Sequence, residues 1–324
     1  MDVVHEWFDV LDRSAEKIAK HTDVPYLEGL VMTADNIVWE KTDPEAIERE
    51  LQTLYERLYR LETSAEQVRK ALQLTILKGM KNASQPQHQM TPDAVALFIS
   101  YLVNKFPLKD GWTLLDPAVG TGNLLTCVLN HAQKKYGQAQ GVDVDELLIK
   151  LALSSVNLQQ HDVELYRQDS LRPLLIDPVD IVLCDLPYGV YYDKENAKRF
   201  KTATTEKPLS QFLMIEQALS YTKPGGFLIF IIPNDLFAMD NDRLLHAVIQ
   251  EAGIVLGILQ LPKTMFRHAD FAKSLLLLRK KGDGVKAPRQ ALLAELPSFK
   301  NREAMTAMMS RINQWFGENF SDGQ

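Results

Sequence analysis

The sequence predicts an α/β protein with a Rossmann-like, mostly parallel sheet that carries helices on both faces and follows a helical N-terminal region. Short apolar runs without polar alternation are separated by amphipathic segments of about 10–15 residues, which is typical of parallel strands covered on both sides. The chain ahead of these runs has helical periodicity instead. The composition, with 46% hydrophobic and 24% charged residues, is that of a globular protein.

Helices are predicted for the region ahead of the sheet. Apolar residues at helical spacing indicate a first helix over Asp2–Lys20. Asp43 is a favourable N-cap, and Pro44 suits the first position of the helix that would follow it. Ser64, with Gln67 three residues later, forms a capping-box pattern ahead of another helix.

We expect this region to form a separate helical domain, residues 1–84. Within it, the apolar patch Val24–Met32 is the segment with strand character. The polar, proline-containing stretch Lys81–Gln89 follows, and we interpret it as the domain boundary. Residues 85–324 are then the second domain, which ends in a short helical extension.

Strands and helices alternate in the second domain. Its first helix is predicted to begin at Thr91-Pro92-Asp93. The predicted strands are continuous apolar runs: Trp112–Leu115, Gln140–Val144, Val163–Arg167, Val179–Cys184, Gly226–Ile232, Ile254–Gln260 and Phe271–Leu278. The predicted helices have amphipathic spacing: Gly122–Tyr136, Glu146–Leu158, Leu209–Tyr221, Arg243–Glu251 and Asn301–Phe316. Because open α/β sheets bind ligands beyond the carboxyl ends of their strands, functional residues are expected in those loops.

The net charge of −6 is distributed unevenly along the chain. Residues 1–186 hold 18 basic and 28 acidic side chains, a net charge of −10, whereas residues 187–324 hold 18 and 14, a net charge of +4. The basic excess begins with one cluster: Lys194, Lys198, Arg199, Lys201 and Lys207. A positive surface on an acidic chain favours nucleic acid as a partner, although a solvated loop would give the same pattern.

The number of cysteines and the hydropathy of the chain indicate the cellular compartment of the protein. Two cysteines, Cys127 and Cys184, exclude a disulfide-built secreted fold. The N-terminus is acidic and amphipathic rather than signal-like, and no apolar run approaches the ~20 residues that span a bilayer. The sequence therefore predicts a cytoplasmic protein with no membrane partner. The seven histidines have no metal-ligand spacing, so no metal is expected.

The first predicted strand of the sheet runs into the loop DPAVGTGN, residues Asp116–Asn123. Gly120 and Gly122 permit a tight turn, and the helix that follows offers free N–H groups. The loop is neither the G-x-G-x-x-G motif of nicotinamide enzymes nor a phosphate loop. Asp116 would repel a pyrophosphate and attract a cation, so a ligand with an ammonium group, such as S-adenosylmethionine, fits better.

Carboxylates also follow the next two strands. Asp143, 21 residues after Gly122, is placed to accept hydrogen bonds from both hydroxyls of a ribose. Asp169, next to Ser170, is placed to accept one from an adenine amino group. Either aspartate alone could be an ordinary turn or capping residue. Three aspartates at the ends of consecutive strands favour a nucleoside-containing cofactor.

The fourth strand ends in Asp185-Leu186-Pro187-Tyr188. An exocyclic amine has a delocalised lone pair, and a site that methylates it must accept hydrogen bonds from both of its N–H groups. The Asp185 side chain and the Leu186 carbonyl supply such a pair of acceptors, and Tyr188 suits stacking on a flat group. A base in a duplex would first be flipped out. The alternative is a plain turn with a buried tyrosine.

Together these motifs resemble class I S-adenosylmethionine-dependent methyltransferases of the kind that methylates amino nitrogens. The chain is most similar to adenine-N6 DNA methyltransferases, namely the modification subunits of type I restriction systems and the small bacterial YtxK-like proteins. The resemblance covers about residues 85–281 and implies a methyltransferase-type sheet. It implies a catalytic segment formed by Asp185, Leu186, Pro187 and Tyr188. It also implies that S-adenosylmethionine contacts Thr91, Pro92, Asp116, Pro117, Ala118, Gly120, Gly122, Asn123, Asp143, Asp169 and Ser170.

The chain departs from the family pattern in two respects. The family segment reads Asp/Asn-Pro-Pro-Tyr/Phe, and Leu186 replaces its first proline, which adds an N–H and leaves the turn less fixed. About 40 residues follow the last predicted strand, too few for a target-recognition domain, so a homodimer or a separate recognition partner is expected.

The predicted reaction is methylation of adenine N6 in DNA. Two alternatives stay open. One is methylation of RNA or of a protein glutamine amide, since an amide nitrogen needs the same two acceptors. The other is a regulatory module that binds the cofactor without turnover.

Overall fold

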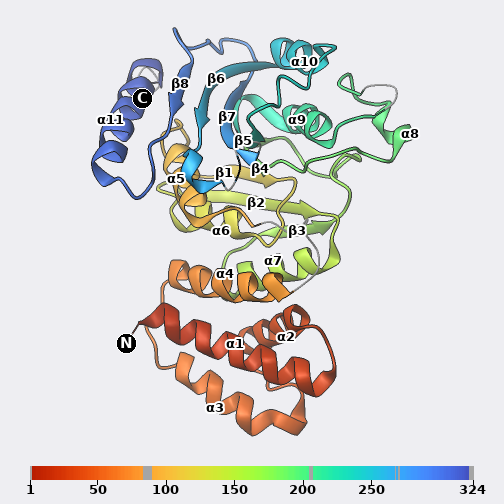
Figure 1. Ribbon diagram of the computed structural model, residues 1–324, viewed down its shortest axis with the longest axis vertical. Coiled ribbons are helices and arrows are strands. Elements are labelled where there is room, and N and C mark those ends of the chain that lie inside the picture. Colours follow the sequence, from red (N-terminus) through yellow and green to blue (C-terminus); the bar gives the residue numbers. More distant parts are fainter. Residues whose placement is uncertain (1, 83–89, 204–206, 267, 269–270, 321–324) are drawn as a thin grey trace. The chain divides into compact units, whose positions relative to one another are not determined.

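Eight strands form one sheet in the computed structural model, which describes residues 2–82, 90–203, 207–266, 268 and 271–320 (Figure 1). The strand order is β3-β2-β1-β4-β5-β7-β6-β8. Strand β7 is antiparallel to β5 and β6, whereas the β1–β4, β4–β5 and β6–β8 pairs are parallel. The strands are β1 Trp112–Asp116, β2 Tyr136–Asp143, β3 Glu164–Arg167, β4 Val179–Asp185, β5 Thr222–Pro233, β6 Gly253–Gln260, β7 Lys273–Lys280 and β8 Leu292–Glu295. The predicted fold class, a mostly parallel sheet with helices, is confirmed.

The register of the central strands places the candidate catalytic segment. Asp185 at the end of β4 pairs with Ile231 of β5. Two residues further along β5, Pro233 pairs with Lys273 at the start of β7. Residues far apart in sequence therefore meet beyond the carboxyl ends of β4 and β5, where β7 begins.

The described chain divides into two compact units that interleave in sequence. The first unit comprises Met1–Ser100, Val119–His131 and Gly141–Arg167, and the second comprises Tyr101–Ala118, Ala132–Gln140 and Gln168–Gln324. One division falls within the glycine loop, after Ala118, and another within β2. The domain boundary at residues 84/85 stays a prediction, and most of the expected boundary stretch, residues 83–89, lies outside the described residues.

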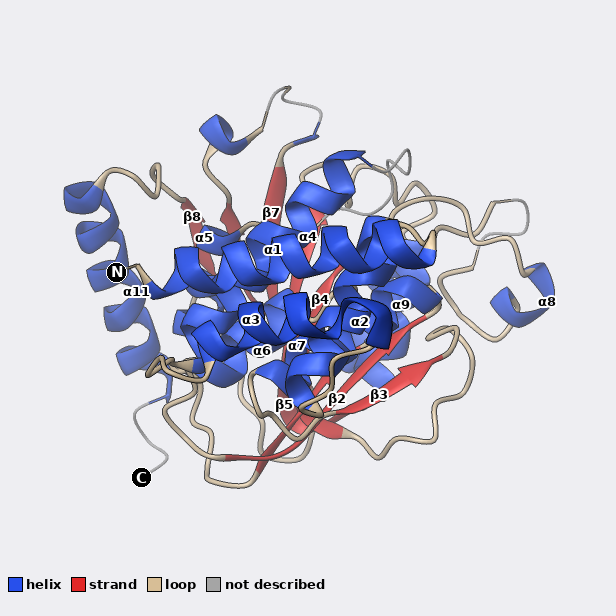
Figure 2. Cartoon of the chain, turned by 90° about the horizontal axis from the view of Figure 1, so that it is seen from below, coloured by secondary structure: helices blue, strands red, loops and turns tan. Residues whose placement is uncertain are grey.

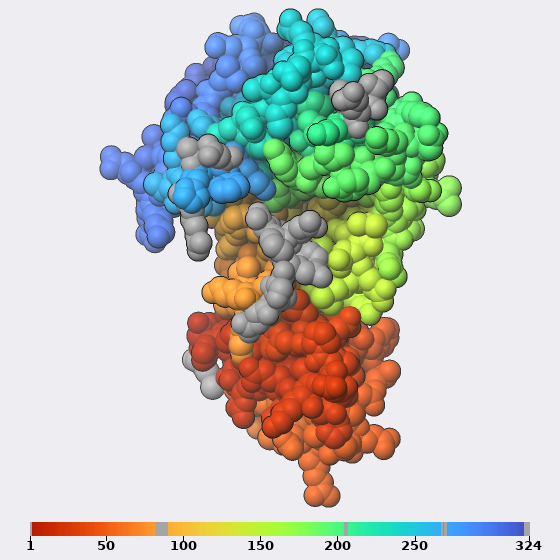
Figure 3. All heavy atoms as spheres, turned by 45° about the vertical axis from the view of Figure 1, so that its right-hand side comes forward, coloured from red at the N-terminus to blue at the C-terminus, as the bar shows by residue number. Residues whose placement is uncertain are grey.

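The first unit is mainly helical. Helix α1 lies beside α2, α3 and α4, and α2 and α4 both pack on α7 (Figures 1 and 2). Figure 3 shows the side chains of the first helices gathered into one continuous body. Buried leucines from α1, α2, α3, α4 and α7 share a single core. The helices of this unit are α1 Val3–Thr22, α2 Tyr26–Val38, α3 Glu48–Leu58, α4 Ala65–Asn82, most of α5 Asp93–Val103, α6 Asn123–Asn130 and α7 Glu146–Leu158.

Local predictions in this unit have mixed outcomes. The capping box is confirmed, because the Gln67 N–H lies 3.3 Å from the Ser64 hydroxyl and the Ser64 N–H donates to the Gln67 side chain at 2.9 Å. The strand character of Val24–Met32 is wrong, since most of this patch lies in α2 and packs on α1. Asp43 does not cap a helix. Its N–H and carbonyl both bond to the Asn36 side chain, and α3 begins only at Glu48.

The second unit contains the helices α8 Lys194–Ala197, α9 Ser210–Ser220, α10 Leu244–Ala252 and α11 Arg302–Phe320. Helix α9 packs on β5 and α10 packs on β6. The helix predicted to run to Tyr136 ends at Asn130. Lys135 directly precedes β2, where its N–H donates to the Asp110 side chain at 2.8 Å and its carbonyl accepts the Gly111 N–H at 2.7 Å. Strand β8 had no prediction. No described helix combines the length and apolar character needed to cross a bilayer.

Candidate functional site

The glycine loop in the first unit has the conformation that its sequence predicts. Gly120 and Gly122 have φ values of +54° and +77°, which side-chain-bearing residues rarely adopt. No described atom lies within 4 Å of the position that a Cβ on Gly120 would take. Gly122 backs onto α7, where a Cβ would lie 3.4 Å from the Ala152 Cα. The loop is therefore closed on one side and open on the other, as a cradle for a ligand must be.

Asp143 holds this loop at the end of β2. Its Oδ2 accepts the Gly120 N–H at 3.0 Å, and its Oδ1 accepts the Asp145 N–H at 2.9 Å. Burial raises the pKa of the Asp143 carboxyl, and the backbone hydrogen bonds oppose that rise only in part. The carboxylate thus fixes the loop, and its contact with a ribose stays a prediction.

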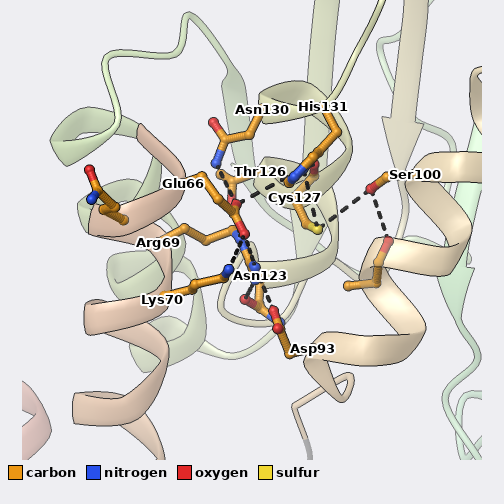
Figure 4. A network of polar contacts seen from close by, with 12 residues as sticks. Glu66, Arg69, Lys70, Asp93, Ser100, Asn123, Thr126, Cys127, Asn130 and His131 are labelled. Carbon is orange, nitrogen blue, oxygen red and sulfur yellow. Dashed lines mark hydrogen bonds and ion pairs between the residues drawn. The ribbon is translucent and has the colours of Figure 1, made fainter. Parts of the chain in front are cut away.

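A buried polar network joins α4 to the starts of α5 and α6 (Figure 4). Asn123, the first residue of α6, accepts a hydrogen bond from Arg69 at 2.7 Å and donates one to the Thr91 carbonyl at 3.0 Å. Thr91 is buried and Pro92 is exposed. Two predicted cofactor segments, separated by 32 positions between Thr91 and Asn123, are therefore in direct contact. Sequence analysis missed Arg69, since its spacing from Glu66 indicates an ion pair but not burial.

Glu66, Cys127 and His131 are the described side chains whose potential metal-ligating atoms lie close together, within 4.8 Å of one another. Both Glu66 oxygens accept hydrogen bonds from Arg69 at 2.7 Å, and the His131 Nδ1 lies 2.8 Å from the Cys127 carbonyl oxygen. Burial raises the pKa of the Cys127 thiol to about 11. A metal ion here would face a buried guanidinium, so we interpret the cluster as structural.

In the second unit, Asp116 and Ser170 organise the other half of the glycine loop. Asp116 is buried, and its Oδ1 accepts the Ala118 N–H at 3.1 Å. The Ser170 hydroxyl donates to the Pro117 carbonyl at 2.5 Å, and the Ser170 carbonyl accepts from Gln217 at 2.8 Å. Asp116, Pro117, Ala118 and Ser170 thus lie in one connected group, and their contact with the cofactor stays a prediction.

Asp169 is bonded within the protein. Its Oδ1 accepts the Leu171 N–H at 2.9 Å and its Oδ2 accepts the Tyr191 hydroxyl at 2.5 Å. Burial and the bond to Asp169 raise the pKa of Tyr191 to about 12. Asn196 of α8 also donates to the Tyr191 hydroxyl. Asp169 therefore joins the loop after β3 to the loop that carries the basic cluster, and its contact with an adenine stays a prediction.

The segment Asp185–Tyr188 leaves the end of β4 with distinct environments for its residues. Asp185 forms an ion pair with Lys273, whose Nζ lies 2.9 Å from Oδ1. Leu186 is buried, and its N–H donates to the Ile231 carbonyl at 3.2 Å. Tyr188 is 69% exposed, so the alternative of a buried tyrosine is wrong. The N–H that Leu186 adds relative to proline therefore ties the segment to β5.

Gln211 of α9 supports the turn that follows. Its Oε1 accepts the N–H of Gly189, which has a φ of +125°, at 3.2 Å. The Gln211 side chain is buried, and its Nε2 is the buried side-chain polar atom without a hydrogen-bond partner among the described residues. Sequence analysis missed Gln211, because it lies in no motif, and it missed the pairing of Lys273 with Asp185, because these residues lie 88 positions apart.

The five residues of the basic cluster, Lys194, Lys198, Arg199, Lys201 and Lys207, are all exposed. Lys198 pairs with Glu195 at 2.6 Å and Lys201 pairs with Glu251 at 2.7 Å. Surface pairs of this kind contribute only about 0–1 kcal/mol, so a polyanion can compete for these cations.

The fold and these strand-end loops define an S-adenosylmethionine-dependent methyltransferase, and the predicted cofactor is confirmed. The chain belongs to the N-6 DNA methylase family, whose model matches residues 78–319. A second family model, the YtxK N-terminal helical domain, matches residues 5–80.

Individual relatives agree with this assignment. The Bacillus subtilis (strain 168) protein YtxK is 44% identical over 322 residues, which are 97% of this chain and 98% of that protein. A Listeria monocytogenes crystal structure assigned to the class I S-adenosylmethionine-dependent methyltransferases is 39% identical, with a TM-score of 0.89 and coverage of 97% and 99%. The Escherichia coli type I restriction enzyme EcoEI methylase subunit is 24% identical over 65% of this chain and 46% of its own length.

Proposed function

We propose that this methyltransferase transfers the methyl group of S-adenosylmethionine to an exocyclic amino nitrogen, namely N6 of adenine in DNA. The observation that carries the proposal is the environment of Asp185–Tyr188 at the end of β4. It combines a carboxylate held by Lys273, a backbone carbonyl next to it and an exposed aromatic ring.

The chemistry follows from these groups. When bound, S-adenosylmethionine supplies an electrophilic methyl group on a sulfonium centre. The Asp185 carboxylate and the Leu186 carbonyl accept hydrogen bonds from the amino group and draw its nitrogen toward tetrahedral geometry. The ion pair with Lys273 restricts the rotamer of Asp185, so the acceptor is oriented before substrate binds.

The surroundings of the segment suit a nucleic acid. Tyr188 and Tyr192 are 69% and 90% exposed, and an aromatic face in solvent offers a stacking surface for an unpaired base. The exposed basic cluster on and beside α8 would bind phosphates. Partner recognition through a homodimer or a separate subunit is part of the same proposal.

We assign cofactor contacts to two groups of residues. In the first unit, Thr91, Pro92, Gly120, Gly122, Asn123 and Asp143 would hold the cofactor, and the open space beside Gly120 supports this. In the second unit, the connected group Asp116, Pro117, Ala118, Asp169 and Ser170 would do so. Both cysteines are buried and neither forms a disulfide, which suits a reducing compartment, and we propose the cytoplasm.

Transfer of a tritiated methyl group from S-adenosylmethionine tests the proposal. The purified protein is incubated separately with unmethylated DNA, ribosomal RNA and a protein extract, and each is repeated with Asp185→Ala. We expect label in N6-methyladenine of DNA and a loss of about 10²–10³-fold for the variant. Label in RNA or in glutamine amides instead of DNA would show that the substrate is RNA or a protein. Cofactor binding without any Asp185-dependent label would favour the regulatory module.

A further inference from the structure

Arg69 of α4 is 1% exposed. Among the fully buried side chains of the described residues, it belongs to the residue with the largest volume. Its guanidinium donates to three partners in the first unit (Figure 4). Nε and Nη2 bond to the two oxygens of Glu66 at 2.7 Å, Nη2 also bonds to Asp93 at 2.5 Å, and Nη1 bonds to the Asn123 side chain at 2.7 Å. One buried cation therefore joins α4 to α5 and α6.

The positions of two partners connect this network to the cofactor segments. Asp93 is the first residue of α5 and directly follows Thr91-Pro92. Asn123 is the first residue of α6 and directly follows the glycine turn. Arg69 therefore bonds to the residue at which each segment enters its helix. Asn123 closes the connection by donating to the Thr91 carbonyl.

A contribution to the stability of the fold does not explain why a charged residue is buried at this position. Burying a guanidinium and its carboxylates removes their hydration, and an apolar replacement of the whole group is often equally stable. What a planar, multiply bonded guanidinium provides is a defined geometry, because its donors have fixed directions. The geometry defined here is that of the two segments.

We propose that Arg69 is a positioning residue that holds Thr91-Pro92 and the glycine loop in the geometry that binds the cofactor. Helix α4 thereby supports the cofactor site. The proposal rests on the assignment of Thr91-Pro92 and the glycine loop to the cofactor. Arg69 lies within residues 5–80, which match the YtxK N-terminal helical domain, so that domain contributes to cofactor affinity. By linkage, bound cofactor stabilises α4 in turn.

Isothermal titration of the full chain with S-adenosylmethionine tests this with Arg69→Lys. Lysine keeps the positive charge between Glu66 and Asp93, but one ammonium cannot also hold Asn123 in the same geometry. The matched control is Arg57→Lys. Arg57 bonds to two carboxylates of α1, Glu6 at 2.6 Å and Asp9 at 2.8 Å, and none of these is in a cofactor segment.

We expect the Kd for S-adenosylmethionine to rise about tenfold or more in Arg69→Lys and to stay within about twofold in Arg57→Lys. The KM for S-adenosylmethionine should rise with it, while kcat at saturating cofactor changes little. A folded Arg69→Lys protein with the native Kd would overturn the inference and leave the proposed function intact. If the native protein bound no S-adenosylmethionine, the cofactor assignment itself would fail.

Hydrogen exchange on the native protein gives a second test that needs no variant. Adding S-adenosylmethionine should slow amide exchange in α4 near Arg69 together with the glycine loop, and leave α3 unchanged. Slower exchange in the glycine loop with no change in α4 would contradict the proposed connection.

Discussion

The proposed cofactor segments of the first unit and the proposed catalytic segment of the second differ in the burial of their polar and aromatic side chains. Arg69 and Asn123 are buried and bonded, and Asp143 holds the glycine loop through backbone N–H groups. Tyr188 and Tyr192, by contrast, are largely exposed to solvent. A small ligand can be enclosed by side chains that are already in place. A macromolecular substrate is large enough to shield exposed side chains from solvent when it binds.

The largest effect is expected at the glycine loop, Asp116–Asn123, which we propose holds the cofactor. Gly120→Ala places a methyl group in the open space beside the loop, and we expect the Kd for S-adenosylmethionine to rise about 10²-fold, as for a misplaced ligand. Calorimetric titration measures it. Gly284→Ala is the matched control, because Gly284 also has a positive φ, +75°, with no described atom within 4 Å of its Cβ position. Equal affinities of the two variants would contradict the cradle.

The exposed tyrosine should matter only on the substrate side. Tyr188→Ala removes the stacking surface. We expect kcat/KM for the nucleic acid to fall about 30-fold, which corresponds to a loss of about 2 kcal/mol of stacking free energy. The Kd for S-adenosylmethionine should stay the same. Tyr59→Ala, which removes a 56% exposed tyrosine at the end of α3, serves as the control. An effect of Tyr188→Ala no larger than that of Tyr59→Ala would remove the proposed role of the segment.

Restoring the family pattern at Leu186 tests how the segment is held. Leu186→Pro removes the N–H that donates to Ile231 and shrinks a buried side chain. We expect the free energy of unfolding to fall by about 1.5 kcal/mol in urea titrations. Leu186→Ala keeps the N–H and separates the two contributions. An unchanged stability of Leu186→Pro would show that the bond to β5 contributes nothing.

The smallest effect is electrostatic and depends on pH. Burial alone would raise the pKa of Glu66, but the hydrogen bonds and charge of Arg69 outweigh it and hold that pKa below its usual value of 4.5. A lowered pKa in the folded state stabilises the protein above the unfolded value, and this stabilisation is lost as pH falls through the folded value. Glu66→Gln should therefore cost about 1 kcal/mol near neutral pH and progressively less under acid conditions.

Unfolding in urea across this pH range measures the difference between Glu66→Gln and the native protein. A difference that stays constant from neutral to acid pH would contradict the role of the Glu66–Arg69 pair. Lys70, which is half-buried and whose Nζ lies 3.5 Å from the Glu66 Oε1, provides a control through Lys70→Gln, which should change stability little.

Local chemistry made much of the fold and of the candidate site predictable. Ser64 and Gln67 form the expected capping box, and the glycines of the loop adopt positive φ values because no other residue does so at low cost. The failures arose where a distant partner overrode the local pattern. Asp43 looked like an N-cap, but Asn36 binds its backbone. Lys135 was expected in a helix, but the Asp110 side chain and the Gly111 N–H bind its backbone directly ahead of β2.

The sequence by itself determined which residues follow the strand ends, because turns depend on the φ range of glycine and proline and on short polar side chains. Only the tertiary structure decided what surrounds them. Lys273 reaches Asp185 over 88 positions through the register of β4, β5 and β7, and Arg69 reaches Asn123 over 54 positions through the packing of α4 on α6. Register and helix packing are set by the whole core, so no local pattern in the sequence contains either contact.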